Sequence, residues 1–295
     1  MALVLQVDNS KIATLGDFVE FVRSGVDLTD TDSIASAAPM LRSLANDHTL
    51  VVDHLNRLVK ERFRKQAVPS AQVVVLAAAP GFYVRANIWP SNADVAAGRV
   101  YQDQFAYNVA HDHNYNFLTV GYYGPGYVTD LYEYDFEKIE GFPGEKVDLR
   151  FVETLHFKTG MVMLYRASKD VHLQHPPNDL SLTLNLLVAP DTVRLRDQYY
   201  FDLEKSTLLN FPNELNSSMR GSLLRIAAQL GDGNTEELLH DLAARHPCRR
   251  TRLAAYEALV QMRPTAANRL WELAAADPEP YVAKSARQHL APAAA

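Results

Sequence analysis

The chain has 295 residues, 47% of them hydrophobic and 22% charged, a composition typical of a globular protein with a sizeable core. Its single cysteine, Cys248, excludes an internal disulfide framework and fits a reducing cytoplasm, where we expect the protein to reside. The net charge of -6 argues against nucleic acid or anionic lipid as a partner. No apolar run approaches the roughly 18 residues of a membrane span, so no membrane association is expected.

Residues 1–70 are predicted to form a helical segment that packs on the following domain. The N-terminus lacks a basic region and a long apolar run, so no signal peptide is expected. A short helix should be capped by Asp32 or Ser33 and should end near Ala37, before Pro39. A second helix is expected over residues 48–64. Its apolar residues fall on one face at helical spacing: Val51, Leu55, Leu58, Val59 and Phe63.

Residues 71–212 have the pattern of an antiparallel β-domain. Short runs rich in β-branched and aromatic residues alternate with turns such as Gly124-Pro125-Gly126 and Thr159-Gly160. Many short strands at regular spacing favour a sandwich or a barrel. The predicted strands cover residues 73–76, 82–90, 117–123, 127–134, 148–157, 160–167, 170–174 and 180–188.

A His-x-His pair, His111 and His113, lies in this β-domain, and His172 lies in a later strand-like stretch. Residues two apart on a strand point to the same face, so the pair can offer two imidazole nitrogens to one metal ion. A neighbouring strand can bring the third. Three neutral imidazoles suit iron, zinc, copper or nickel and leave coordination positions open for chemistry. His175 and His156 are the alternatives for the third ligand.

Residues 213–295 are predicted to be helical throughout. Amphipathic helices are expected over residues 220–230, 235–245, 249–262, 265–275 and 280–290. Leu230, Leu259 and Leu290 recur about 30 residues apart, a spacing typical of helical repeats. This segment resembles short HEAT-type repeats. Stacked helix pairs expose an extended surface, so the segment is a candidate site for a protein partner or for homodimerisation.

The β-domain resembles the cupin superfamily, in which a His-x-His pair is followed by a lone histidine after a glycine-led strand. Gly160, His172 and Asn185 occupy the later positions of that pattern. Among cupins it is most similar to the cysteine-dioxygenase-like enzymes, because an Arg-bearing aromatic strand containing Arg85 precedes the pair. The resemblance implies an α+β protein. Its centre would be a cupin-type antiparallel β-barrel (a double-stranded β-helix), flanked by N-terminal helices and a C-terminal α-helical repeat.

Two departures from the cupin pattern bear on the chemistry. Phe117 and Leu118 fill the positions where many cupins carry a ligating glutamate, which favours a site of three histidines. The Ser-x-His-x-Tyr run of thiol dioxygenases is reduced to Ser181-Leu-Thr183-Leu-Asn185, so cysteine is not the expected substrate. Zinc fits three histidines as well as iron does. The family resemblance favours Fe(II).

Several residues are candidates for roles around the metal. Arg85 is expected to bind a substrate carboxylate. Strand alternation places Tyr115 on the face of the histidines and favours Tyr165 over Arg166 as the inward residue, so both tyrosines are candidate substrate-binding residues. On the strand after the pair, one face carries Tyr132 and the other Glu133. Both are candidate catalytic residues, and the pattern does not choose between the faces.

These features predict a mononuclear non-heme iron oxygenase. It would act with dioxygen on a small amine, thiol or carboxylate substrate, free or borne on a peptide or carrier. One alternative is a 2-oxoglutarate-dependent hydroxylase, which normally needs a carboxylate ligand. Another is a non-catalytic, metal-binding cupin that acts as a sensor or scaffold.

Overall fold

A computed structural model describes residues 2–62, 71–101, 104–190, 193, 195–209 and 214–290, with the side chains of 214–218 left aside. The chain divides into two compact units. Unit 1 comprises residues 1–136, 147–193 and 200–206, and unit 2 comprises residues 137–146, 194–199 and 207–295. The predicted residues Phe63 and Arg64 lie outside the described ranges.

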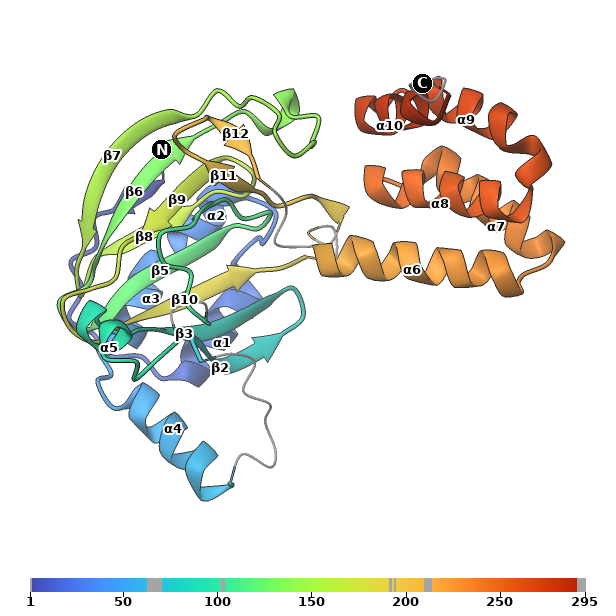
Figure 1. Cartoon of the computed structure of the whole chain (residues 1–295). Coiled ribbons are helices and arrows are strands. Elements are labelled where there is room, and N and C mark those ends of the chain that lie inside the picture. The colour runs from blue at the N-terminus through green and yellow to red at the C-terminus, as the bar shows by residue number, and fades with distance from the viewer. Residues whose placement is uncertain are drawn as a thin grey trace. The chain divides into compact units, whose positions relative to one another are not determined.

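Unit 1 contains the N-terminal helices and nearly all the strands (Figure 1). Its helices are α1 (Leu15–Gly25), α2 (Thr31–Ser36), α3 (Ala38–Ala45), α4 (Leu50–Lys60) and α5 (Asn92–Ala96), and a 3-10 turn begins at Phe136. Its strands are β1 (Leu3–Leu5), β2 (Val73–Ala79), β3 (Phe82–Trp89), β4 (Ala110–His111), β5 (Phe117–Tyr123), β6 (Tyr127–Glu133), β7 (Arg150–Phe157), β8 (Val162–Tyr165), β9 (Asp170–Gln174), β10 (Ser181–Val188) and β11 (Tyr200–Asp202).

The strands form two antiparallel sheets. The first has the order β1-β8-β5-β10-β3-β2, and within unit 1 the second has the order β11-β4-β9-β6-β7. The expected barrel is therefore not closed. Over the residues described, the edge strands β1, β2 and β7 pair only within their own sheets, so the ladder does not close.

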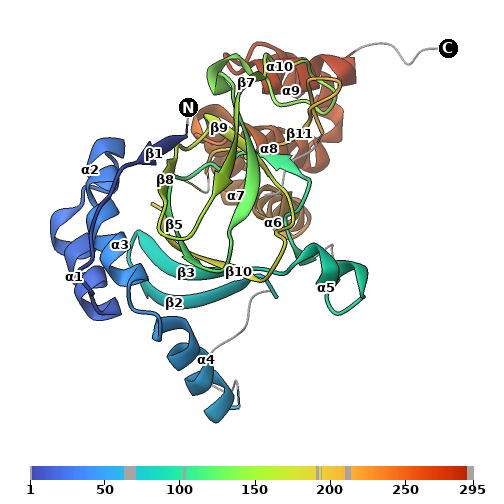
Figure 2. The same ribbon diagram turned by 90° about the vertical axis from the view of Figure 1, so that its left-hand side faces the viewer.

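The two sheets share an interior, and the first sheet has a second core on its other face. Strand alternation divides the residues of β3, β5, β8 and β10 between these two cores. Figure 2 shows α1 and α3 beside the first sheet. The core between the sheets is rich in aromatic residues and contains Trp89, Phe105, Tyr107, Phe117, Tyr127, Leu131, Phe157, Met163, Tyr165 and Leu187. The core under the helices is mainly aliphatic and includes Leu41, Leu44, Val84, Leu118, Val120, Leu164, Leu184 and Leu186.

Helices α1, α2 and α5 of unit 1 begin at side-chain caps, whereas α3 and α4 begin without one. Thr14 and Asp17 form a capping box at the start of α1. The cap expected at Asp32 or Ser33 is Asp30, because its carboxylate accepts hydrogen bonds from the backbone N–H groups of both residues. The prediction placed the helix start two to three residues too late.

Unit 2 is a stack of helices around one core. The helices are α6 (Glu214–Leu230), α7 (Gly233–Arg245), α8 (Arg249–Met262), α9 (Ala267–Ala275) and α10 (Pro280–Leu290), and strand β12 (Thr207–Leu208) precedes them. They confirm the predicted helical segment closely. Their buried contacts are made mostly by alanine and leucine, with Tyr256 and Trp271 as the aromatic members. The small residues allow close packing of helix pairs, as in helical repeats.

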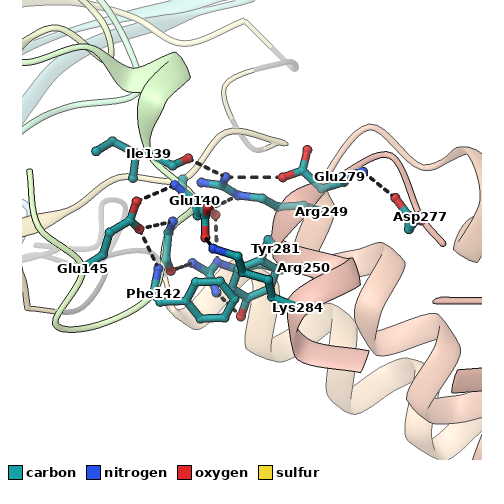
Figure 3. Close-up of polar contacts among 12 residues, drawn as sticks. Ile139, Glu140, Phe142, Glu145, Arg249, Arg250, Asp277, Glu279, Tyr281 and Lys284 are labelled. Carbon is teal, nitrogen blue, oxygen red and sulfur yellow. Dashed lines mark hydrogen bonds and ion pairs between the residues drawn. The ribbon is translucent and has the colours of Figure 1, made fainter. Parts of the chain in front are cut away.

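Two segments from earlier in the chain belong to unit 2, residues 137–146 and 194–199. Asp197 accepts hydrogen bonds from Arg249 Nε at 2.9 Å and from Arg250 Nε at 3.0 Å. Figure 3 shows the first segment against α8 and α10, where Arg249 donates to the Ile139 carbonyl and Phe142 stacks on Tyr281. The helical repeats therefore hold two segments that are far away in sequence.

No described helix is long and apolar enough to cross a membrane.

Candidate metal centre

His111 and His172 meet across neighbouring strands. β4 pairs with β9, and His111 lies directly opposite His172 in the register. Residues opposite each other in an antiparallel pair share a face, so both rings point the same way. Their Nε2 atoms lie 3.0 Å apart, and both side chains are buried.

His113 completes the group from irregular backbone. β4 ends at His111, so the His-x-His pair does not lie on one regular strand as expected. The backbone beyond β4 is held by a hydrogen bond from Ser168 N–H to the His113 carbonyl, 2.7 Å long. The ring centroid of His113 still lies 5.0 Å from those of His111 and His172. One ligand nitrogen from each histidine lies within 4.8 Å of the other two.

The hydrogen bond of the His111 ring favours metal binding. His111 Nδ1 lies 2.8 Å from the Val109 carbonyl oxygen. Because a carbonyl only accepts, Nδ1 carries the proton and Nε2 presents its lone pair to the cluster. Burial lowers the pKa of His111 and holds that of His172 well below its usual value, and the neighbouring histidines lower the His172 pKa further. Neutral imidazole is the form that ligates metals.

Aromatic rings surround the three imidazoles. Tyr115 stacks on His113 with centroids 4.7 Å apart, and Tyr165 meets His172 edge to face at 4.5 Å. Phe117 touches His113, and Tyr200 of β11 lies 6.1 Å from His111. The structure therefore brings Tyr115 and Tyr165 to the cluster, although Tyr115 lies on irregular backbone between β4 and β5 rather than on the expected strand. These rings keep the site apolar and shield it from solvent.

Arg85 acts electrostatically on this group. It lies on β3 opposite Asn185 of β10, and its charge lowers the pKa of His111. It also acts on Tyr115, where burial raises the pKa to about 12 and the positive charge opposes that rise. Arg85 Nε is buried and, within the described residues, has no hydrogen-bond partner. A donor left in this state is suited to an anionic ligand.

The neighbouring carboxylates are engaged elsewhere. Asp112, between the two histidines, accepts a 2.6 Å hydrogen bond from the Tyr134 hydroxyl. Asp170, on β9, forms an ion pair with Arg166 at 2.6 Å. In the part of the chain that the structure describes, the metal-ligand cluster consists of three histidines and includes no carboxylate.

The pairing of β6 with β9 determines which face of β6 is turned to the histidines. Leu131 lies opposite His172, so its face, which includes Glu133, is turned to the histidines. The Glu133 carboxylate instead pairs with Arg166 at 2.7 Å and with Arg150. Tyr132 lies on the other face and packs against Phe151 with centroids 5.3 Å apart. The placement of Tyr132 at the histidines is therefore wrong, because strand alternation turns it away.

The alternative third ligands lie outside the cluster. His175 Nε2 is bonded to Asp130 Oδ2 at 2.7 Å, and its side chain is 42% exposed. His156 Nε2 contacts the Pro125 carbonyl at the surface. Of the three candidates, His172 alone joins His111 and His113.

Sequence reasoning missed four residues around the histidines. Val109 contributes only a backbone carbonyl, which no side-chain pattern reveals. Tyr200 comes from a distant strand paired with β4. Gln174 and Thr129 lie opposite each other on β9 and β6, two residues along from His172 and Leu131. The alternation on β9 predicts that Gln174 shares the face of His172, and this signal could have found it.

Comparison with known proteins identifies the C-terminal segment. Residues 207–291 match the HEAT repeats family. A search of curated proteins finds no match.

Several solved structures are distantly similar, at TM-scores that carry no functional argument. A hydroquinone 1,2-dioxygenase from Sphingomonas sp. TTNP3 is 10% identical, covering 45% of this chain and 72% of that chain with a TM-score of 0.27. A structure of the DMSP lyases RdDddP and RnDddQII is 13% identical, covering 61% of this chain and 75% of that chain with a TM-score of 0.25. The vicilin of Solanum melongena is 9% identical, covering 61% of this chain and 42% of that chain with a TM-score of 0.28.

Proposed function

We propose that the protein is a mononuclear non-heme iron oxygenase of the cupin type. Its iron(II) would be held by His111, His113 and His172. The observation that carries the proposal is the meeting of three imidazole nitrogens within 4.8 Å of one another, from two separate stretches of the chain. Imidazole is a good ligand for iron, and the cupin resemblance favours iron over zinc.

The residues present fit such a metal. The two Nε2 atoms 3.0 Å apart belong to neutral rings, and the Val109 carbonyl fixes the tautomer of His111. Three protein ligands leave coordination positions open. Iron(II) bound there would supply the activation of dioxygen beside a substrate.

The surrounding residues would bind the substrate and exclude water. Arg85 would bind an anionic group, since its Nε is buried without a hydrogen-bond partner among the described residues. Tyr115, Tyr165 and Phe117 would pack on the histidine rings and keep bulk water out. The substrate would thus be a small molecule, or the end of a larger one, with a carboxylate or a similar anion.

The two alternatives differ from this proposal in testable ways. A 2-oxoglutarate-dependent hydroxylase normally needs a ligating carboxylate, and the described cluster offers only histidines. Turnover of 2-oxoglutarate to succinate would support it nonetheless. A sensor or scaffold would keep its biological activity in the variant His113→Ala even though metal is lost.

Elemental analysis of protein purified without oxygen tests the proposal. We expect stoichiometric iron in the wild type and loss of iron in His113→Ala. His156→Ala is the matched control, because His156 is a surface histidine outside the cluster and should leave the iron content unchanged. Fully active protein containing zinc and no iron would overturn the oxygenase proposal.

A further inference from the structure

Helix α6 carries an exposed apolar stripe. Figure 1 shows α6 as an outer helix of unit 2, where it packs mainly on α8. Four large hydrophobic side chains on α6 are half-exposed or more: Met219 51%, Leu223 65%, Ile226 50% and Leu230 83%. Their intervals of four, three and four residues place all of them on one face of the helix. Such a stripe is typical of a helix that pairs with another helix.

The stripe is not the face that α6 turns to the core of unit 2. Gly221 lies so close to α8 that a Cβ atom there would be 3.6 Å from the Ala254 Cβ. Leu224 and Ala228 belong to the same inner face and pack in the core. At 3.6 residues per turn, this inner face lies on the opposite side of the helix from the stripe. α6 therefore has two apolar faces, and the core of unit 2 covers one of them.

The border of the stripe carries little charge. It consists of Ser222 and Gln229 on one side and of Ala227 and Arg220 on the other. Arg220 Nε donates to the Thr251 hydroxyl at 2.9 Å, so this guanidinium is turned to α8. Arg225 also lies nearer to the inner face, where its charge opposes the rise that burial causes in the pKa of Glu257.

This distribution of charge indicates what covers the stripe. A border rich in lysine and arginine would suit an acidic partner or an anionic membrane, and an acidic border would suit a basic partner. A neutral border suits another apolar stripe without charges. A second copy of the chain supplies one and brings no like charges together in the seam.

The spacing of the stripe is the same when it is read in either direction. A two-fold axis between residues 224 and 225 would place Leu223 of one copy opposite Ile226 of the other, and Met219 opposite Leu230. We propose that the protein forms a homodimer by antiparallel pairing of α6 with α6 of a second copy. This inference is independent of the proposed iron chemistry.

Sedimentation velocity of the whole chain tests the dimer. One helix pair buries less than the roughly 800 Å² per partner of a standard interface, so we expect a reversible dimer with a dissociation constant on the order of micromolar. The wild type should change from monomer to dimer between about 0.1 and about 500 µM, a range that brackets this value. A wild type that stays monomeric throughout would overturn the proposal, because the stripe would then be covered by something other than a second copy.

Single substitutions test whether the stripe makes the contact. Leu223→Glu and Ile226→Lys each put a charge without a partner into an apolar seam, so each should weaken the dimer at least about tenfold. Leu273→Glu is the matched control, because Leu273 is 52% exposed but lies on α9, outside the stripe. It should leave the dissociation constant unchanged. If Leu223→Glu has no effect, or has only the effect of Leu273→Glu, the stripe is not the interface.

A mixture of the variants Leu223→Glu and Ile226→Lys tests the antiparallel arrangement. The two-fold axis places the carboxylate of one copy opposite the ammonium of the other, so the mixture should dimerise although each variant alone does so poorly. A parallel pair would align residue 223 with residue 223 and would gain nothing from mixing. Recovery in the mixture also shows that both variants are folded. A mixture that dimerises no better than its components would overturn the antiparallel pairing.

Discussion

At the residue scale, the hydrogen-bond partner of each polar group near the histidines determines what it can do. Asp112 lies between two candidate ligands in sequence, yet its carboxylate is fully buried and bonded to the Tyr134 hydroxyl at 2.6 Å. This bond holds the carboxylate away from the imidazole nitrogens. Tyr134 therefore positions the chain between His111 and His113.

The variant Tyr134→Phe tests this role. It removes a hydrogen bond to a buried carboxylate, so we expect a loss of about 1–3 kcal/mol in the free energy of unfolding, measured by urea titration. Iron affinity should fall as well. Tyr123→Phe, at a tyrosine that is 58% exposed, should change neither quantity. Equal effects from the two variants would show that the Asp112 bond has no special role.

The same scale shows what sequence patterns could predict about the site. Strand alternation was enough to place Tyr165 beside His172, whereas Tyr115 reaches His113 from irregular backbone between β4 and β5. Alternation could not choose a face for β6, because it gives two equivalent faces until a neighbouring strand sets the register. Tyr132 was misplaced for this reason. The carbonyl of Val109 could not be predicted, since its role depends only on backbone position.

At the element scale, the end of β5 packs closely against the segment that connects β7 with β8. Gly121 lies at the end of the regular pairing of β5, and its carbonyl accepts a hydrogen bond from Gly160 N–H at 2.8 Å. A Cβ atom at Gly121 would collide with the Lys158 carbonyl oxygen. The close approach of two backbones requires glycine here.

We expect Gly121→Ala to destabilise the β-domain. The added methyl group must displace backbone rather than a flexible side chain, so the loss should reach about 1–3 kcal/mol or more by urea unfolding. Gly25→Ala is the control, because nothing lies within 4 Å of its added Cβ. Unchanged stability in Gly121→Ala would contradict the close packing described for this segment.

Elements were predictable where one pattern extends over many residues. The five C-terminal helices follow a sustained apolar period, and four of them lie within two residues of their predicted positions, whereas α6 begins six residues before its predicted start at residue 220. The bounds of β4 could not be predicted, because the strand is only two residues long and is defined by its pairing with β9 and β11. Such a strand is created by its neighbours rather than by its own sequence.

At the scale of the whole molecule, contacts distant in sequence determine the organisation. The two sheets do not close into the barrel that the strand pattern suggested, because closure depends on edge pairing that local sequence does not encode. In unit 2, residues 137–146 and 194–199 pack with helices that begin only at Glu214. No periodic pattern predicts this association.

The variant Asp197→Ala tests the contacts within unit 2. The Asp197 carboxylate forms ion pairs with Arg249 and Arg250, and all three side chains are at most 13% exposed. Removing the carboxylate leaves buried positive charge, so unfolding should become easier by about 3 kcal/mol. Hydrogen exchange should quicken in residues 137–146 and 194–199 as well as in α8.

A surface ion pair provides the comparison. Asp241 and Arg245 are 3.2 Å apart on α7, with side chains 59% and 82% exposed. Asp241→Ala should cost less than about 1 kcal/mol, because exposed pairs contribute little. If Asp197→Ala cost no more than this, the two segments would not be held by the buried charges.

X-ray absorption spectroscopy of the iron-loaded protein at the iron edge tests the central claim most directly, because it counts the imidazoles bound to the metal. The account predicts three imidazole ligands in the wild type, two in His172→Ala, and three in His175→Ala, whose histidine is bonded to Asp130 instead. A wild-type spectrum with fewer than three imidazoles, or one that His172→Ala leaves unchanged, would contradict it.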